Sequence, residues 1–136
     1  MIKEQKTVTQ LCNEAYQTAK EKGFHDKQFN TGEKLMLIVS ELGEALEADR
    51  KNKNVIDSSE FHRIETLGLR NIDTHPDDSF NREFPKHIKD TFEDELADAC
   101  IRIFDLAGSL GIDLDWHIQA KMKYNKSREK LHGKSY

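Results

Sequence analysis

Residues 33–49 read EKLMLIVSELGEALEAD, and this stretch decides the fold of the chain. Its apolar side chains recur at the i, i+3, i+4, i+7 spacing of an amphipathic helix. They form one apolar stripe: Leu35, Ile38, Val39, Leu42 and Leu46. Polar or small residues, including Ser40, Gly43 and Glu47, fall on the opposite side. The pattern predicts a helix that is N-capped by Thr31, runs to about Lys51 and turns this stripe toward a core.

Two carboxylates of the same stretch belong to neither side. At about 100° per residue, Glu41 and Glu44 lie one turn apart on one flank. The apolar residues expected around Glu41 there are Leu37, Ala45 and Ala48. A carboxylate among apolar residues is costly unless a cation meets it, and two such carboxylates favour a divalent ion between them. The alternative is an ordinary charged helix edge, in a chain of which 34% is charged.

Length and composition favour a single all-α domain spanning residues 1–136. The net charge of −4 gives no general attraction to a nucleic acid polymer or an anionic membrane. No secretory segment or long apolar run is visible, so a cytoplasmic location is expected. Cys12 and Cys100 are then interpreted as buried packing residues.

Three further core helices are expected. The first covers about residues 5–22 and ends at Gly23, the third opens near Pro85 and reaches about Leu110, and the fourth follows an Asp113 N-cap to about Ser127. Residues 52–83 read as an insertion with one short helix, either a flap or an oligomer contact.

The third helix should be central and buried, because it is apolar almost all round from Leu96 onward. Its exception is a strip with Glu95, Asp98, Arg102 and Asp105. Asp98 and Arg102 have the i, i+4 spacing of an ion pair, but four charges exceed what one pair needs.

The fourth helix begins with an apolar face that continues as Lys121, Asn125 and Arg128. This change indicates either a helix that enters an anionic site or a solvated C-terminal segment. Phe24, in the linker before the second helix, is either a lid over the core or a ligand contact.

Two acidic motifs complete the pattern. E-x-x-E on the second helix and E-x-x-D on the third supply Glu41, Glu44, Glu95 and Asp98, which can meet across an antiparallel helix pair. An all-oxygen cluster suits Mg²⁺ or Mn²⁺. Zinc is disfavoured because no Cys or His lies among the four, and a di-iron bundle would need Glu-x-x-His pairs.

The segments ELGEALEADR, DELADACIRIFDLAGSLGIDLDWHI and KMKYNKSREKLHGK resemble the MazG-like all-α nucleoside triphosphate pyrophosphohydrolases. That superfamily includes dimeric dUTPases and phosphoribosyl-ATP pyrophosphohydrolases. The resemblance covers about residues 33–51 and 93–134. It implies a helical bundle that assembles as a homodimer or homotetramer. It also implies Mg²⁺-dependent hydrolysis of a nucleoside triphosphate to the monophosphate and pyrophosphate.

The resemblance also implies roles for individual residues. The four motif carboxylates, Glu41, Glu44, Glu95 and Asp98, correspond to metal ligands, and Glu44 is our choice for the group that orients or deprotonates water. The resemblance gives as contacts to phosphate, sugar or base Lys121, Asn125, Arg128 and Lys134. Phe24 is a further expected contact to substrate, from its position next to the acidic helix and not from the resemblance. One departure is the long gap between the acidic motifs. A different function class, a non-catalytic helical oligomerisation module with a solvated acidic strip, stays open.

Overall fold

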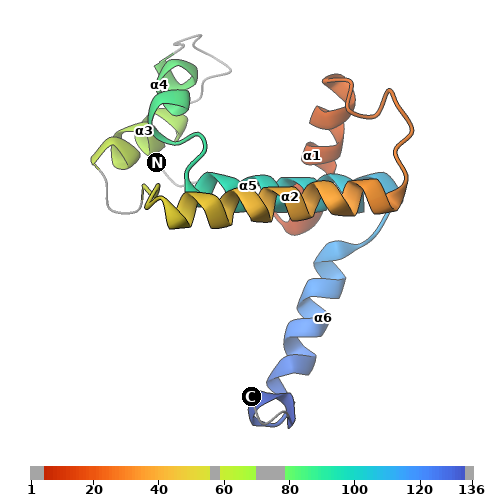
Figure 1. The fold of residues 1–136 in the computed structure, drawn as a ribbon. Coiled ribbons are helices and arrows are strands. Elements are labelled where there is room, and N and C mark those ends of the chain that lie inside the picture. The colour runs from red at the N-terminus through yellow and green to blue at the C-terminus, as the bar shows by residue number, and fades with distance from the viewer. Residues whose placement is uncertain (1–4, 56–58, 70–78, 134–136) are drawn as a thin grey trace. The chain divides into compact units, whose positions relative to one another are not determined.

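The computed structural model describes residues 5–55, 59–69 and 79–133, and every regular element in these ranges is a helix (Figure 1). The all-α prediction is therefore confirmed for this part of the chain. In order, the elements are α1 (Val8–Glu21), α2 (Thr31–Arg50), α3 (Ser59–Leu69), α4 (Ser79–His87), α5 (Phe92–Leu110), α6 (Leu114–Lys126) and the short 3₁₀ helix η1 (Lys130–Gly133).

The chain divides into two compact units. One contains α2, α3, α4 and α5 as far as Arg102, and the other contains α1, α5 from Ile103 onward and α6. None of the described helices is long and apolar enough to cross a membrane.

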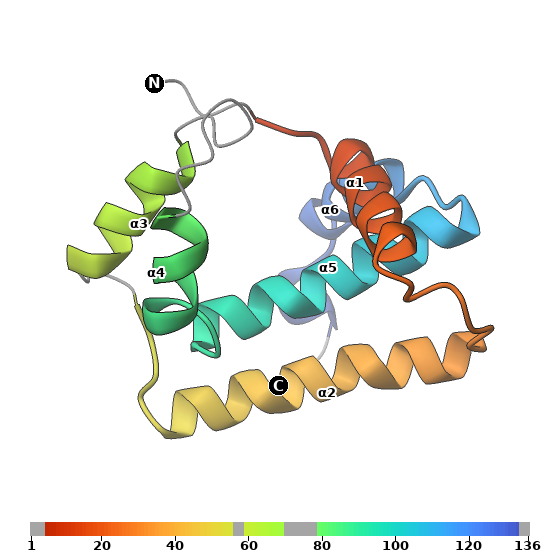
Figure 2. The same cartoon turned by 90° about the horizontal axis from the view of Figure 1, so that it is seen from above.

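In the first unit, α2 lies beside α5 and runs antiparallel to it (Figures 1 and 2). A capping box starts α2 one residue before the predicted cap. The Asn30 side chain accepts from the Glu33 backbone N–H at 2.9 Å, and the Glu33 carboxylate accepts from the Asn30 N–H at 2.8 Å. Thr31 is therefore the first helical residue and not the N-cap.

The predicted buried face of α2 is wrong. Its buried residues are Ile38, Glu41, Ala45 and Ala48, whereas the other four members of the apolar stripe are between 49% and 53% exposed. The face that carries these buried residues is centred roughly 100° around the helix from the stripe. Packing on the small residues leaves the leucines of the stripe uncovered within this chain.

The start of α5 also differs from the prediction. Pro85 lies inside α4 and does not open the third core helix, which begins at Phe92. Ahead of it, the Thr91 hydroxyl donates to the Ile88 carbonyl at 2.7 Å. Three acidic residues in the first turn, Glu93 to Glu95, suit the positive end of the helix dipole.

The burial of α5 is less complete than predicted. Ala99 and Ala107 are buried, but several larger apolar residues are exposed within this chain: Leu96, Ile101, Ile103 and Leu110. Cys100 is exposed too, contrary to the prediction, whereas Cys12 on α1 is buried as expected.

The segment between α2 and α5 has a hydrophobic cluster of its own. Val55, Ile64 and Ile88 are buried, and the aromatic rings of Phe61, Phe80 and Phe84 pack against them. The sequence predicted one short helix here, but both α3 and α4 are present and pack on each other. Because Phe80 and Phe84 are one turn apart on α4, both rings reach the cluster despite Pro85.

Backbone hydrogen bonds join this segment to α5. The Phe92 N–H donates to the Lys53 carbonyl at 2.8 Å. The Val55 N–H donates to the two oxygens of Glu93 at 3.1 and 3.2 Å. The first turn of α5 is thereby fixed next to residues 53–55, which follow α2, and this holds the acidic residues of that turn in place.

In the second unit, α1 crosses α5 at Gly108. A Cβ atom added there would lie 2.7 Å from the Cys12 carbonyl oxygen and 2.8 Å from the Tyr16 Cβ. Only glycine permits this approach. The predicted Asp113 cap of α6 is confirmed, since its carboxylate accepts from the Trp116 N–H at 3.0 Å.

We predict opposite effects for two glycine-to-alanine changes. Gly108→Ala should lower the free energy of unfolding by about 1–3 kcal/mol, because the methyl group meets backbone and a Cβ that cannot swing away. Gly43→Ala should raise it by roughly 0.5–1 kcal/mol, because nothing lies within 4 Å of the added Cβ and alanine favours the helix. Urea unfolding measures both. A Gly108→Ala protein as stable as the parent would contradict the helix crossing.

Candidate metal centre

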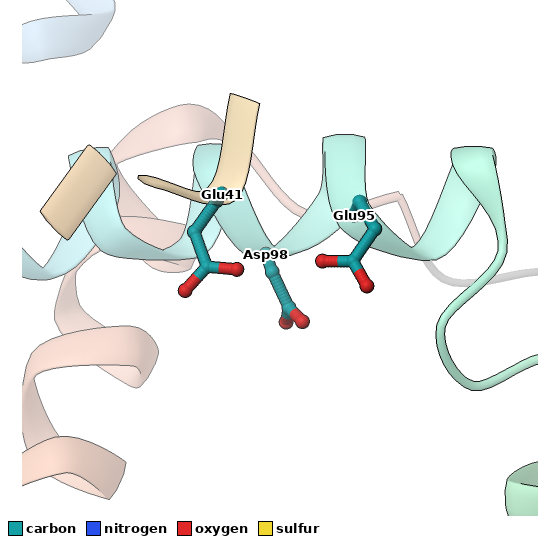
Figure 3. Close-up of side chains that lie close together, drawn as sticks. All are labelled: Glu41, Glu95 and Asp98. Atoms are coloured by element: carbon teal, nitrogen blue, oxygen red, sulfur yellow. The ribbon is translucent and has the colours of Figure 1, made fainter. Parts of the chain in front are cut away.

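Three of the four predicted carboxylates converge between α2 and α5. Glu41 comes from α2, and Glu95 and Asp98 come from successive turns at the start of α5 (Figure 3). One oxygen from each residue can be chosen so that all three lie within 4.8 Å of one another. We call these three residues the acidic triad. All three side chains extend to the same side of the α5 axis in Figure 3.

Two members of the acidic triad are withdrawn from water. Glu95 is 4% exposed and Glu41 6% exposed, whereas Asp98 is more open. The Oε2 atom of Glu95 is buried and has no hydrogen-bond partner among the described residues. A buried acceptor without a donor carries its full desolvation cost, which is higher still for an ionised group. The cluster therefore contains a side chain that needs a partner which this part of the chain does not supply.

Burial and like charge raise the pKa values of two members of the triad, Glu95 and Asp98. The pKa of Glu95 rises to about 7, mainly because the carboxyl is buried, and further because of the negative charges of Glu44, Asp98 and Glu41. This occurs in the first turn of α5, where the helix dipole acts in the opposite direction. The pKa of Asp98 is also raised, first by burial and then by Asp94 and Glu41.

One cation reaches the acidic triad. The Arg102 Nε donates to the Oε1 atom of Glu41, and the Arg102 side chain is 38% exposed. The sequence spacing had paired Arg102 with Asp98, and that ion pair is not formed. The positive charge of Arg102 still lowers the pKa of Asp98, against the larger effects that raise it. This link from α5 to α2 is a contact that sequence reasoning missed.

Glu44 lies outside the acidic triad. Its side chain is exposed on α2, one turn after Glu41, yet its charge is the second cause of the raised Glu95 pKa. The structure thus places Glu44 near the triad without making it one of the three converging groups. Asp105, on the same predicted strip of α5, belongs to a different contact: it bonds the His25 Nε2 at 2.7 Å.

Two predicted substrate contacts, Lys121 on α6 and Arg128 just after it, lie beside the same aromatic ring. The Lys121 Nζ lies 5.1 Å from the centre of the Tyr124 ring, and the Arg128 guanidinium lies 5.7 Å from it. Asn125 is partly buried, and its Oδ1 has no hydrogen-bond partner among the residues that the structure describes. Phe24 is exposed, so it covers no core in this chain. Lys134 lies outside the described residues.

Comparison with known proteins does not assign this chain to a family. No protein-family model, curated protein or solved structure matches the chain. The chemistry of the donor atoms is therefore the guide to the ligand. Three carboxylates, two of them buried and one with an unsatisfied oxygen, form a set suited to a cation that prefers oxygen ligands.

We predict that Glu95→Gln raises the melting temperature of the metal-free protein at pH 8 by about 3–5 °C. The folded-state pKa of about 7 lies above the unfolded value. Protonated Glu95 therefore favours folding below the unfolded pKa, and this contribution is lost as the pH rises through 7.

Melting in a chelator at pH 4.5 and at pH 8 tests this sign. At pH 4.5 the parent carboxyl is largely protonated in the folded protein, so parent and variant should melt at nearly the same temperature. A variant that is less stable than the parent at both pH values would show that the Glu95 carboxylate is already well satisfied.

Proposed function

We propose that this protein is a divalent-metal-dependent nucleoside triphosphate pyrophosphohydrolase, as its resemblance to the MazG-like enzymes implies. The observation that carries the proposal is the buried Glu95 oxygen within the acidic triad, which no described residue partners. A salt-bridged or solvated strip would not leave a carboxylate in this state, because the folded protein then bears its desolvation cost without compensation.

Mg²⁺ or Mn²⁺ fits the triad best. Both are hard cations that take carboxylate oxygens, and no Cys or His belongs to the cluster of described residues. Glu41, Glu95 and Asp98 would hold the ion, leaving its other positions for water and substrate phosphate. Such an ion polarises a phosphoryl oxygen and neutralises charge that develops on the leaving group.

The protein's own groups then have distinct tasks. The triad fixes where the triphosphate sits relative to α2 and α5. In the reaction, a water oxygen bonds to the α-phosphorus while the bond from that phosphorus to the bridging oxygen breaks, and pyrophosphate leaves. A carboxylate takes the proton from the water. We assign that role to Glu44, because it lies near the triad but outside it and is open to solvent.

Side chains on α6 and just after it are assigned to the substrate by their chemistry. Lys121 and Arg128 are cations held beside the Tyr124 ring, and the Asn125 amide has an unsatisfied oxygen. Cations suit phosphate, and an aromatic face or an amide suits a base or sugar. These contacts, with Lys134 and Phe24, stay predictions.

Assembly of two or four copies is part of the proposal. Leu35, Val39, Leu42 and Leu46 form an uncovered apolar row on α2, next to the face that packs on α5. Contiguous apolar surface of this kind marks a contact with another protein surface. A second copy of the chain would cover it and complete the helical bundle.

The row alone also suits a second candidate function, a non-catalytic helical oligomerisation module. Such a module needs the exposed apolar row but not the acidic triad. Glu95 therefore separates the two functions, because only a metal site gives its buried oxygen a role.

We predict that the parent protein with Mg²⁺ or Mn²⁺ converts a nucleoside triphosphate to the monophosphate and pyrophosphate. Glu95→Gln and Asp98→Asn should each lose most of this activity, whereas Glu47→Gln should keep it, because that exposed carboxylate on α2 pairs with Lys51 at 3.0 Å. Chromatography of a panel of canonical and modified triphosphates measures the products. Diphosphate and orthophosphate as products would rule out attack at the α-phosphorus, and no hydrolysis of any member would favour the module.

We predict that Leu42→Glu and Leu46→Glu weaken self-association of the chain, because each places a charge in the uncovered apolar row. Ser40→Glu is the control, since it adds the same charge on an exposed side of α2 away from the row. Sedimentation velocity should show a dimer or tetramer for the parent and the control, and smaller species for the two leucine variants. A monomeric parent at micromolar concentration would argue against assembly.

A further inference from the structure

The ion pair between Arg102 and Glu41 stands at the edge of the acidic triad. The Arg102 Nε donates to Glu41 Oε1, which joins α5 to α2 directly. Counting side chains alone, Glu41 is 8% exposed and Arg102 38% exposed. The cation therefore lies at the solvent side of the contact and the anion at the protein side. Arg102 can leave the contact at little cost to itself, while Glu41 cannot lose its partner cheaply.

The charges of the cluster do not balance. Arg102 forms an ion pair with one carboxylate of the triad, Glu41. Neither Glu95 nor Asp98 has an ion-pair partner in the described part of the chain. Glu44 and Asp94 add further negative charge nearby. Without Arg102, the buried Glu41 carboxylate would face only like charges.

From this arrangement we infer that Arg102 is the resident cation of the acidic triad: it neutralises Glu41 in the metal-free protein and competes with a divalent ion for that carboxylate. The inference rests on the metal site of the proposed function. Arg102 therefore acts against metal binding, whereas a residue that oriented Glu41 toward the ion would support it. Arg102 stabilises the fold before the ion arrives, and its charge weakens the binding of the ion.

The physical reason is the same for both effects. A guanidinium at hydrogen-bond distance from Glu41 attracts the triad carboxylates and repels a divalent ion bound to them. Removing the charge should therefore destabilise the metal-free protein and strengthen metal binding. A residue that merely oriented Glu41 would weaken metal binding when removed.

Arg102→Gln tests the inference, with Arg102→Lys and Lys51→Gln beside it. In a chelator, Arg102→Gln should melt about 3 °C or more below the parent. In calorimetric titration with Mn²⁺ alone, it should bind about tenfold more tightly, because a positive charge next to the ion is gone. Arg102→Lys keeps the charge and should resemble the parent in both measurements. Lys51→Gln breaks an exposed pair on α2 and should change neither.

A second measurement uses the parent protein and does not depend on the folding of the variant. The Nε–H resonance of Arg102, assigned by its loss in Arg102→Lys, should shift during a Mg²⁺ titration. The shift should level off at the same Mg²⁺ concentration as the rise in melting temperature. A resonance that stays unchanged at saturating Mg²⁺, or unchanged or weaker Mn²⁺ binding by Arg102→Gln, overturns the competition. A parent that binds neither ion instead overturns the proposed metal site, on which the competition depends.

Discussion

Two carboxylates are buried between α2 and α5, and the packing of these helices depends on how the charges of the two carboxylates are compensated. Glu41 and Glu95 are buried at this contact, and the buried residues one turn away on the same helices include Ile38, Ala45 and Ala99. A buried carboxylate is costly unless a cation or a hydrogen-bond donor meets it, so the contact has to satisfy both charges. Arg102 does this for Glu41. Nothing in the described residues does it for the second oxygen of Glu95. The helix pair is therefore held in an arrangement that favours the arrival of a cation.

This choice of face determines what the rest of α2 presents. A helix can place only one face against α5, and here that face carries Glu41, Ala45 and Ala48. Its leucines are the larger and more hydrophobic side chains, yet they stay about half exposed. An isolated domain would gain several kcal/mol by burying them, at about 1.5–3 kcal/mol for each leucine. The burial of Glu41 and the exposure of the leucines are thus two consequences of one rotation of α2, and the leucines are the surface that the proposed second copy would cover.

The sequence predicted well the extents of long helices with a clear apolar period, and it predicted the contacts between helices less well. The extents of α2 and α6 follow from apolar spacing and turn residues, and the acidic motifs correctly placed three carboxylates together. Periodicity could not choose between two neighbouring faces of α2, because one is apolar by its leucines and the other by its alanines. The i, i+4 spacing likewise suggested Asp98 as the partner of Arg102, but Arg102 pairs with Glu41 on the neighbouring helix instead. α4 was missed because its nine residues contain Pro85 and too few apolar positions to show a period.

The segment between α2 and α5 acts on the acidic triad through its hydrogen bonds to the first turn of α5. Its hydrophobic cluster forms around Val55, whose N–H is held by the Glu93 carboxylate, and the Phe92 N–H is held by the Lys53 carbonyl. These bonds fix the first turn of α5, and Glu95 lies in that turn. If that turn frayed, Glu95 would reach water, and its pKa would return toward the ordinary value as burial was relieved. The segment between α2 and α5 thus helps to keep Glu95 buried, and a buried carboxylate without a donor binds an ion more strongly than a solvated one. Its packing and the chemistry of the triad are coupled through a single helical turn.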